Sequence, residues 1–128
     1  MDKIVIIIFI IIILGAVFFW AFQSGIFSGP AKPVAIPPGI IFFYGQGCPH
    51  CQKVDDYIAQ NKITDTVKFT KLEVWYNRTN QIILAEVAQK CGITSNSVGV
   101  PFIYDGISKC YIGDVDGINF FKNEAGIK

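Results

Sequence analysis

The sequence has almost no net charge, and this excludes one large class of partners. Its 11 lysines and arginines are offset by 10 aspartates and glutamates, which leaves a formal net charge of +1 at pH 7. No stripe of basic residues occurs along the chain. A protein that binds nucleic acid needs such a cationic surface to neutralise phosphates. We therefore expect no nucleic-acid partner.

A polar face is missing from the first part of the chain. An unbroken apolar run extends from Ile4 to Phe22. At 1.5 Å per residue, this run is just long enough to cross a hydrocarbon core of about 30 Å. A cleaved signal peptide has a shorter apolar core and an A-x-A-like cleavage site, and the residues after Phe22 contain no convincing site. We expect residues 1–22 to form an uncleaved signal anchor, that is, one transmembrane helix.

The next segment, residues 23–39, is rich in proline and glycine. This composition neither continues a helix nor builds a sheet, so it predicts a linker between the membrane and a domain. Lys3 and the terminal amine favour a cytoplasmic N-terminus, which places the domain outside the cytoplasm. The four cysteines agree with export, because disulfides persist in oxidising compartments.

Residues 40–128 alternate strand and helix patterns without an internal repeat. The apolar run 40–44 is typical of a central buried strand. Thr79 or Asn80 is a candidate cap for the second helix, and Asp114 or Asp116 for the last. The predicted order is β-α-β-α-β-β-α, an α/β domain. We expect strands at 40–44, 67–75, 100–104 and 108–112, and helices at 49–62, 81–91 and from the last cap through Phe121.

The most informative motif is Cys-Pro-His-Cys at residues 48–51, directly after the first predicted strand. Pro49 fits the first helical position, where its missing N–H costs nothing. The two thiols then lie at the first turn of a helix, whose unpaired N–H groups and dipole favour a thiolate. We expect Cys48 to be the exposed attacking sulfur and Cys51 to resolve the mixed disulfide.

Metal and haem chemistry fit the cysteines poorly. Cys91 and Cys110 lack the close spacing of a zinc knuckle, and haem attachment needs a histidine where Gln52 stands. Cys91 and Cys110 have two interpretations: a structural disulfide, which we favour in an exported chain, or two small buried residues. We expect no metal and no other cofactor than the redox-active pair Cys48 and Cys51.

The element order, the segment from Tyr44 to Cys51 and the sequence Gly99-Val100-Pro101 together resemble the thioredoxin superfamily, and compact members such as glutaredoxins in length. The resemblance covers about residues 39–128. It implies a thioredoxin-like fold with a central mixed four-stranded sheet. It also implies that Pro101 is cis beside the cysteines, and that Val100, preceded by Gly99, offers its backbone to an extended substrate peptide.

The chain differs from other members of that family at two positions. The Pro-His pair between the cysteines is similar to bacterial periplasmic enzymes that donate disulfides, and His50 beside the Cys48 thiolate makes the oxidised form a stronger oxidant. Thioredoxins bury an acid six residues before the first cysteine, where this chain has Phe42. Glu73 is a candidate substitute for that acid, although a solvated charge is the simpler interpretation.

Together these features predict a monomeric, membrane-tethered thiol–disulfide oxidoreductase on the extracytoplasmic side. Its partners would be exported proteins with thiols, and a membrane redox protein that recycles it. A glutathione-dependent, glutaredoxin-like reductase is an alternative, but residues 102–105 offer little cationic character for glutathione. A non-catalytic peptide-binding module is a second alternative, although it would not require paired thiols.

Overall fold

The computed structural model describes residues 2–23 and 34–128, and the chain divides into two units, Met1–Pro33 and Val34–Lys128. The first unit contains one helix, α1 (Lys3–Gln23), whose apolar side chains are exposed along its length. It is long and apolar enough to cross a membrane, as the sequence predicts for the anchor. The predicted linker falls largely on residues 24–33, which lie outside the described residues.

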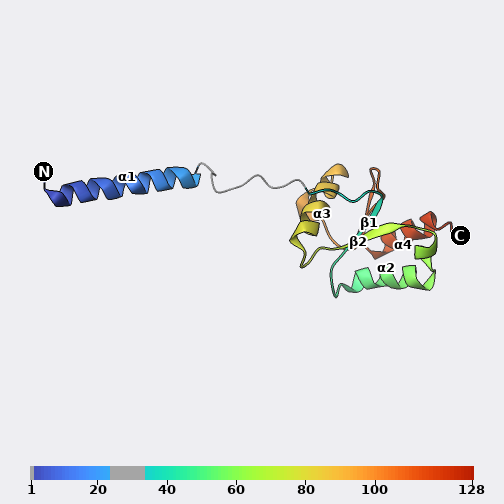
Figure 1. Cartoon of the computed structure of the whole chain (residues 1–128). Helices are drawn as coiled ribbons and strands as arrows, with labels where there is room; N and C mark the ends of the chain where they lie inside the picture. The colour runs from blue at the N-terminus through green and yellow to red at the C-terminus, as the bar shows by residue number, and fades with distance from the viewer. Residues whose placement is uncertain (1, 24–33) are drawn as a thin grey trace. The chain divides into compact units, whose positions relative to one another are not determined.

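The second unit is built on a mixed four-stranded sheet in the order β2-β1-β3-β4. Figure 1 labels strands β1 and β2 and the helices around them. Strand β1 is parallel to β2, which follows it after a helical crossover, and antiparallel to β3. Strands β3 and β4 form an antiparallel hairpin. The strands are β1 (Ile40–Tyr44), β2 (Phe69–Glu73), β3 (Phe102–Tyr104) and β4 (Cys110–Ile112).

Helices cover both faces of this sheet. Helix α3 packs on the face to which Ile41 and Phe43 point, whereas α2 and α4 pack on the face to which Phe42 points. Because successive side chains of a strand point to opposite faces, a strand covered on both sides is apolar throughout. This explains the continuous apolar run of β1. The helices are α2 (Pro49–Gln60), α3 (Arg78–Lys90) and α4 (Asp114–Glu124), with the short 3₁₀ helices η1 (Ile63–Asp65) and η2 (Ser95–Ser97).

The predicted helix caps are wrong. The side chain of Asn77 accepts a hydrogen bond from the backbone N–H of Asn80 at 3.1 Å, so Asn77 caps α3, which begins at Arg78. The last helix has Gly113 at its cap, and Asp114 is its first residue. Asparagine is among the best capping residues, and two polar residues near a helix start are hard to separate by pattern alone.

Candidate active site

The loop between β1 and α2 places both cysteines of the motif at the start of the helix. Cys48 is the cap of α2, and its sulfur accepts a hydrogen bond from the backbone N–H of Cys51 at 3.3 Å. Pro49 is the first helical residue, as predicted. Both cysteines are buried, with exposed fractions of 7% for Cys48 and 2% for Cys51. The prediction that Cys48 is exposed is therefore wrong, because the segment before β3 lies over its sulfur. The first N–H groups of a helix have no acceptor within the helix, and the Cys48 sulfur is the acceptor for one of them.

The two sulfurs are adjacent but differ in their surroundings. Cys51 Sγ donates a hydrogen bond to Cys48 Sγ over 2.6 Å, and the pair is not covalently joined. The pKa of Cys51 is raised to about 12, mainly by burial and secondly by the hydrogen bond to Cys48. At neutral pH only about one Cys51 in 10⁵ is then ionised. Any step in which Cys51 attacks or leaves therefore needs a place for its proton.

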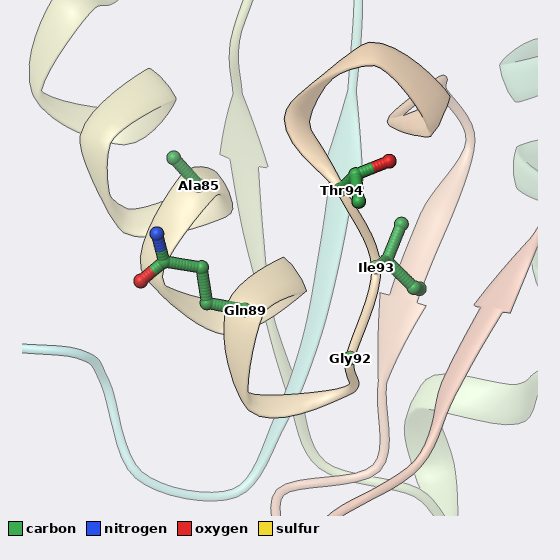
Figure 2. A pocket seen from close by; sticks show the side chains of 5 residues that line it. All are labelled: Ala85, Gln89, Gly92, Ile93 and Thr94. Carbon is green, nitrogen blue, oxygen red and sulfur yellow. The ribbon is translucent and has the colours of Figure 1, made fainter.

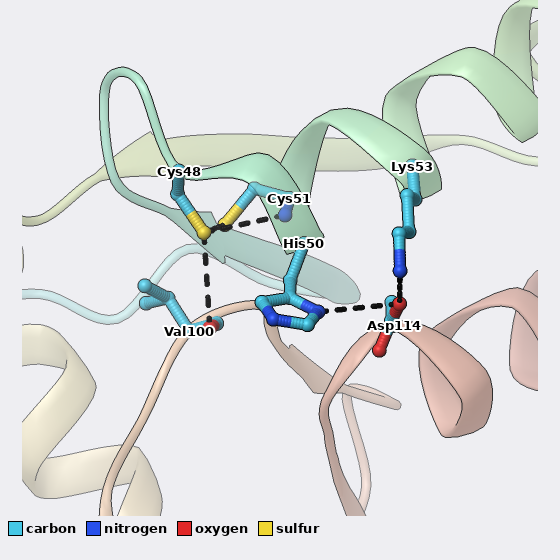
Figure 3. Close-up of polar contacts among 6 residues, drawn as sticks. All are labelled: Cys48, His50, Cys51, Lys53, Val100 and Asp114. Atoms are coloured by element: carbon cyan, nitrogen blue, oxygen red, sulfur yellow. Dashed lines mark hydrogen bonds and ion pairs between the residues drawn. The ribbon is translucent and has the colours of Figure 1, made fainter.

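The segment before β3 lies beside the Cys48 sulfur (Figure 3). The backbone oxygen of Val100 is 3.9 Å from Cys48 Sγ. The bond between Val100 and Pro101 is cis, as the resemblance implies, and Pro101 is fully buried. Gly99 is exposed just before them. The structure thus brings Val100 and Pro101, which come from the other half of the domain, to the Cys48–Cys51 pair.

His50 points from the first turn of α2 towards α4, where it meets a carboxylate that the sequence did not reveal (Figure 3). His50 Nδ1 lies 3.3 Å from Asp114 Oδ2, and Lys53 Nζ lies 2.9 Å from the same oxygen. The hydrogen bonds from Lys53 and then His50 hold the pKa of Asp114 at about 2, well below its usual range. Asp114 is therefore a carboxylate acceptor throughout the physiological pH range.

A second carboxylate reaches the cysteines from α2 itself. Asp55 lines a hollow of about 220 Å³ together with Cys48 and Cys51, and its charge contributes to the raised pKa of Cys51. It lies four residues after Cys51, on the same face of the helix. Lys71 of β2 pairs with it at 2.6 Å and lies over the Tyr44 ring at 4.4 Å.

Glu73, the residue suggested as a substitute acid, holds the loop instead. Its carboxylate accepts four backbone N–H groups, at distances from 2.7 to 3.3 Å, from residues 46, 75, 76 and 77. Desolvation opposes its ionisation, but these hydrogen bonds lower the pKa of Glu73. Gln46 is in the loop that leads to Cys48, so Glu73 ties the end of β2 to that loop. Beside it, a Cβ at Gly45 would collide with the Trp75 indole.

Cys91 and Cys110 form a disulfide in this structure, with their Cα atoms 6.0 Å apart. The bond joins the end of α3 to β4 and is the first of the two interpretations given above. Neither cysteine is near the motif in the sequence, and the sequence separation of 19 residues closes a loop of moderate size.

Replacing Cys91 and Cys110 with alanine is expected to lower the free energy of unfolding of the full-length protein by about 3 kcal/mol, the loop-closure value for such a loop. Urea unfolding in detergent measures this change. The variant should still react through Cys48, which the bond does not contact. An unchanged unfolding midpoint would contradict a stabilising role for this disulfide.

Another hollow, of about 420 Å³, lies at the end of α3 (Figure 2). Its lining contains no ionisable side chain and no cysteine, so it offers nothing for catalysis. Within residues 2–23 and 34–128, no group of three or more histidine, cysteine, aspartate or glutamate side chains is arranged to hold a metal ion. The lining residues of the hollow are Ala85, Gln89, Gly92, Ile93 and Thr94.

Comparison of the chain with protein-family models, with curated proteins and with solved structures found no match. The function of the site must therefore be inferred from its residues and their geometry. Of these, Asp55 was accessible from the sequence, because it follows Cys51 by one helical turn. Asp114 was not accessible, since it lies 64 positions after His50 and only the fold brings the two together.

Proposed function

We propose that the protein is a membrane-tethered thiol–disulfide oxidoreductase that donates disulfides to exported proteins. The observation that carries this proposal is the Cys48–Cys51 pair, with sulfurs 2.6 Å apart at the start of α2. One sulfur caps the helix and the other is held as a thiol by burial. Two neighbouring thiols, one at a helix start and the other held as a thiol, are suited to forming and passing on a disulfide.

The arrangement of the domain supports placing it in the thioredoxin superfamily. The sheet order β2-β1-β3-β4, with α3 on one face and α2 and α4 on the other, agrees with a thioredoxin-like fold. The catalytic cysteines follow the central strand β1, and the Val100–Pro101 segment precedes β3 next to them. An extended substrate peptide would then pair with the Val100 backbone while its sulfur faces Cys48.

Donation begins from the Cys48–Cys51 disulfide. A substrate thiolate attacks Cys48 Sγ, a substrate–Cys48 disulfide forms, and Cys51 leaves and takes up a proton. A second substrate thiolate then attacks the substrate sulfur of the mixed disulfide and releases Cys48. The substrate loses two electrons, which the cysteine pair gains. Because burial favours the thiol form of Cys51, the departed sulfur is slow to attack the mixed disulfide and reverse the step.

Asp55 is the group that we assign to the Cys51 proton. It shares the hollow with Cys51, it interacts electrostatically with that thiol, and Lys71 holds its carboxylate in place. The position at which thioredoxins carry an acid is Phe42, which is fully buried against Phe121 and Tyr44 and has no proton to exchange. The Asp55 carboxylate removes the proton, directly or through water, when Cys51 attacks, and solvent supplies the proton by the same route when Cys51 leaves.

We infer the cellular setting from α1 and from the disulfide between Cys91 and Cys110. An apolar helix at residues 3–23 would tether the domain, and the Cys91–Cys110 bond favours an oxidising compartment. The substrates would be exported proteins with free thiols, and a membrane redox partner would reoxidise Cys48 and Cys51. We expect the tethered protein to act as a monomer.

The reduction potential of the Cys48–Cys51 pair tests the proposed direction. Full-length protein in detergent is equilibrated with glutathione redox buffers, and the alkylated peptides are quantified by mass spectrometry, which separates this pair from Cys91 and Cys110. We expect a potential near those of disulfide donors, at about −120 to −180 mV. A value near that of thioredoxin, about −270 mV, would overturn disulfide donation and leave dithiol chemistry intact.

His50→Tyr is expected to make this potential more reducing. The imidazole supports the thiolate of the reduced form through its positive potential, and tyrosine removes this effect. Each change of about 30 mV corresponds to about 1.4 kcal/mol for the two-electron couple. The same equilibration measures the shift, and an unchanged potential in the tyrosine variant would contradict this role of His50.

A further inference from the structure

The contact between His50 and Asp114 determines more than the direction of the ring. Two features hold Asp114 in place. It is the first residue of α4, and Lys53 donates a hydrogen bond to the same Oδ2 that faces His50. Its side chain is only 18% exposed, whereas that of His50 is 63% exposed. The carboxylate is thus the fixed partner of the contact, and the imidazole is the one that it orients.

An ionised carboxylate only accepts hydrogen bonds, so the nitrogen facing it must carry the proton. His50 Nδ1 is that nitrogen, at 3.3 Å from Asp114 Oδ2. When the imidazole is neutral, its lone pair is then on Nε2. Among the described residues, Nε2 has no hydrogen-bond partner, and the exposed ring leaves it open to an arriving molecule.

We propose that Asp114 fixes His50 with its proton on Nδ1, so that Nε2 accepts the proton of an incoming substrate thiol. The inference rests on the proposed function and assigns Asp114 as a positioning residue. The substrates that gain from it are thiols that are protonated at neutral pH. His50 is two residues from Cys48, on the first turn of the same helix, where such a thiol arrives.

The step balances without another reactant. The substrate thiol gives its proton to Nε2, and the resulting thiolate attacks Cys48 Sγ of the disulfide. The sulfur–sulfur bond between Cys48 and Cys51 breaks, Cys51 leaves with the electron pair and takes up a proton, and the imidazolium returns its proton to solvent. The charged groups around the ring are Asp114 from α4 and Lys53 from α2, with the thiols of Cys48 and Cys51 on the same helix. Lys53 offsets the charge of Asp114 without removing its acceptor oxygen.

The chain offers an unambiguous spectroscopic test, because His50 is its only histidine. We record ¹⁵N spectra of the full-length protein in detergent at a pH where the imidazole is neutral. Wild type is expected to show the proton on Nδ1, and Asp114→Ala is expected to lose this preference. Asp116→Ala is the matched control, since it removes an exposed carboxylate from the same turn of α4 and should leave the spectrum unchanged. A proton on Nε2 in wild type would overturn the proposal.

The kinetic test compares two small thiols as attackers of the oxidised full-length protein at neutral pH. Trifluoroethanethiol is acidic and needs little help from a base, whereas 2-mercaptoethanol is mostly protonated. For 2-mercaptoethanol, His50→Ala is expected to lower the rate constant by about 10²-fold and Asp114→Ala by about tenfold. Asp114→Ala should retain most of the rate with trifluoroethanethiol, and Asp116→Ala should match wild type with both thiols.

The outcomes separate this inference from the proposed function. Equal losses with both thiols in Asp114→Ala, or the same loss in Asp116→Ala, overturn the proton-acceptor role and leave disulfide exchange standing. No reaction of the oxidised wild-type protein with either thiol overturns the proposed function and this inference with it. A loss confined to 2-mercaptoethanol, together with the change in ¹⁵N spectrum, supports the role of the His50–Asp114 pair.

Discussion

Cys51→Ser is expected to abolish disulfide donation by the full-length protein. The variant keeps Cys48 but has no neighbouring thiol with which to hold a disulfide, because the other two cysteines are bonded to each other. Reaction with Ellman's reagent should place one thionitrobenzoate group on Cys48 and stop there. In wild type, Cys51 lies next to Cys48 and should displace that group, so this variant should retain the adduct on a time scale longer by several orders of magnitude.

The control for this result is Cys48→Ser, which leaves Cys51 largely covered as a thiol. We expect this variant to react slowly with the reagent, because burial disfavours the thiolate of Cys51. A glutathione mixed-disulfide assay then distinguishes the glutaredoxin-like alternative, which uses only the first cysteine. Rapid turnover by Cys51→Ser in that assay would favour the glutathione-dependent reductase over the disulfide donor.

The arrangement of the domain was largely accessible from the sequence, because its signals are local. The apolar run of β1 and the glycines that follow it, the proline at position 49 and the β3–β4 hairpin each depend on neighbouring residues. The element order is therefore confirmed, and so is the mixed four-stranded sheet that the resemblance implies. The ends of elements were less accessible. Strands β2, β3 and β4 are shorter than predicted, because pairing with neighbours, not side-chain pattern, decides where a strand ends.

The candidate site also combines residues that the sequence predicts with residues that it does not. The cysteine pair and its place at a helix start could be predicted, whereas the charged groups around it mostly could not. Asp114 contacts His50 across 64 positions of sequence, and Lys71 meets Asp55 across 16. Such pairs are set by which helix covers which face of the sheet. For Glu73, the sequence neighbourhood does not show that four N–H groups occupy its carboxylate.

Asp55→Asn is expected to slow the attack of Cys51 on a mixed disulfide by about 10²-fold at neutral pH, the usual contribution of a positioned base. The thionitrobenzoate adduct of Cys48 measures this step directly, because attack by Cys51 releases the coloured group. Asp56→Asn is the matched control: it removes a neighbouring, exposed carboxylate from the same helix turn. The Asp55–Lys71 pair is 37% exposed on both sides, and such pairs contribute about 0–1 kcal/mol, so the variant should remain folded.

The pH dependence of the attack by Cys51 should differ between wild type and Asp55→Asn. Burial raises the pKa of Cys51 to about 12, so below that pH its thiolate fraction rises tenfold with each pH unit. An unassisted attack must follow that slope, and we expect it in Asp55→Asn. Wild type should be faster at neutral pH and less steep, because Asp55 removes the proton during the attack, and the two rates should converge as the pH rises. If Asp55→Asn and Asp56→Asn gave the same profile as wild type, the proton of Cys51 would have to leave through water, and Asp55 would only hold Lys71 against the sheet.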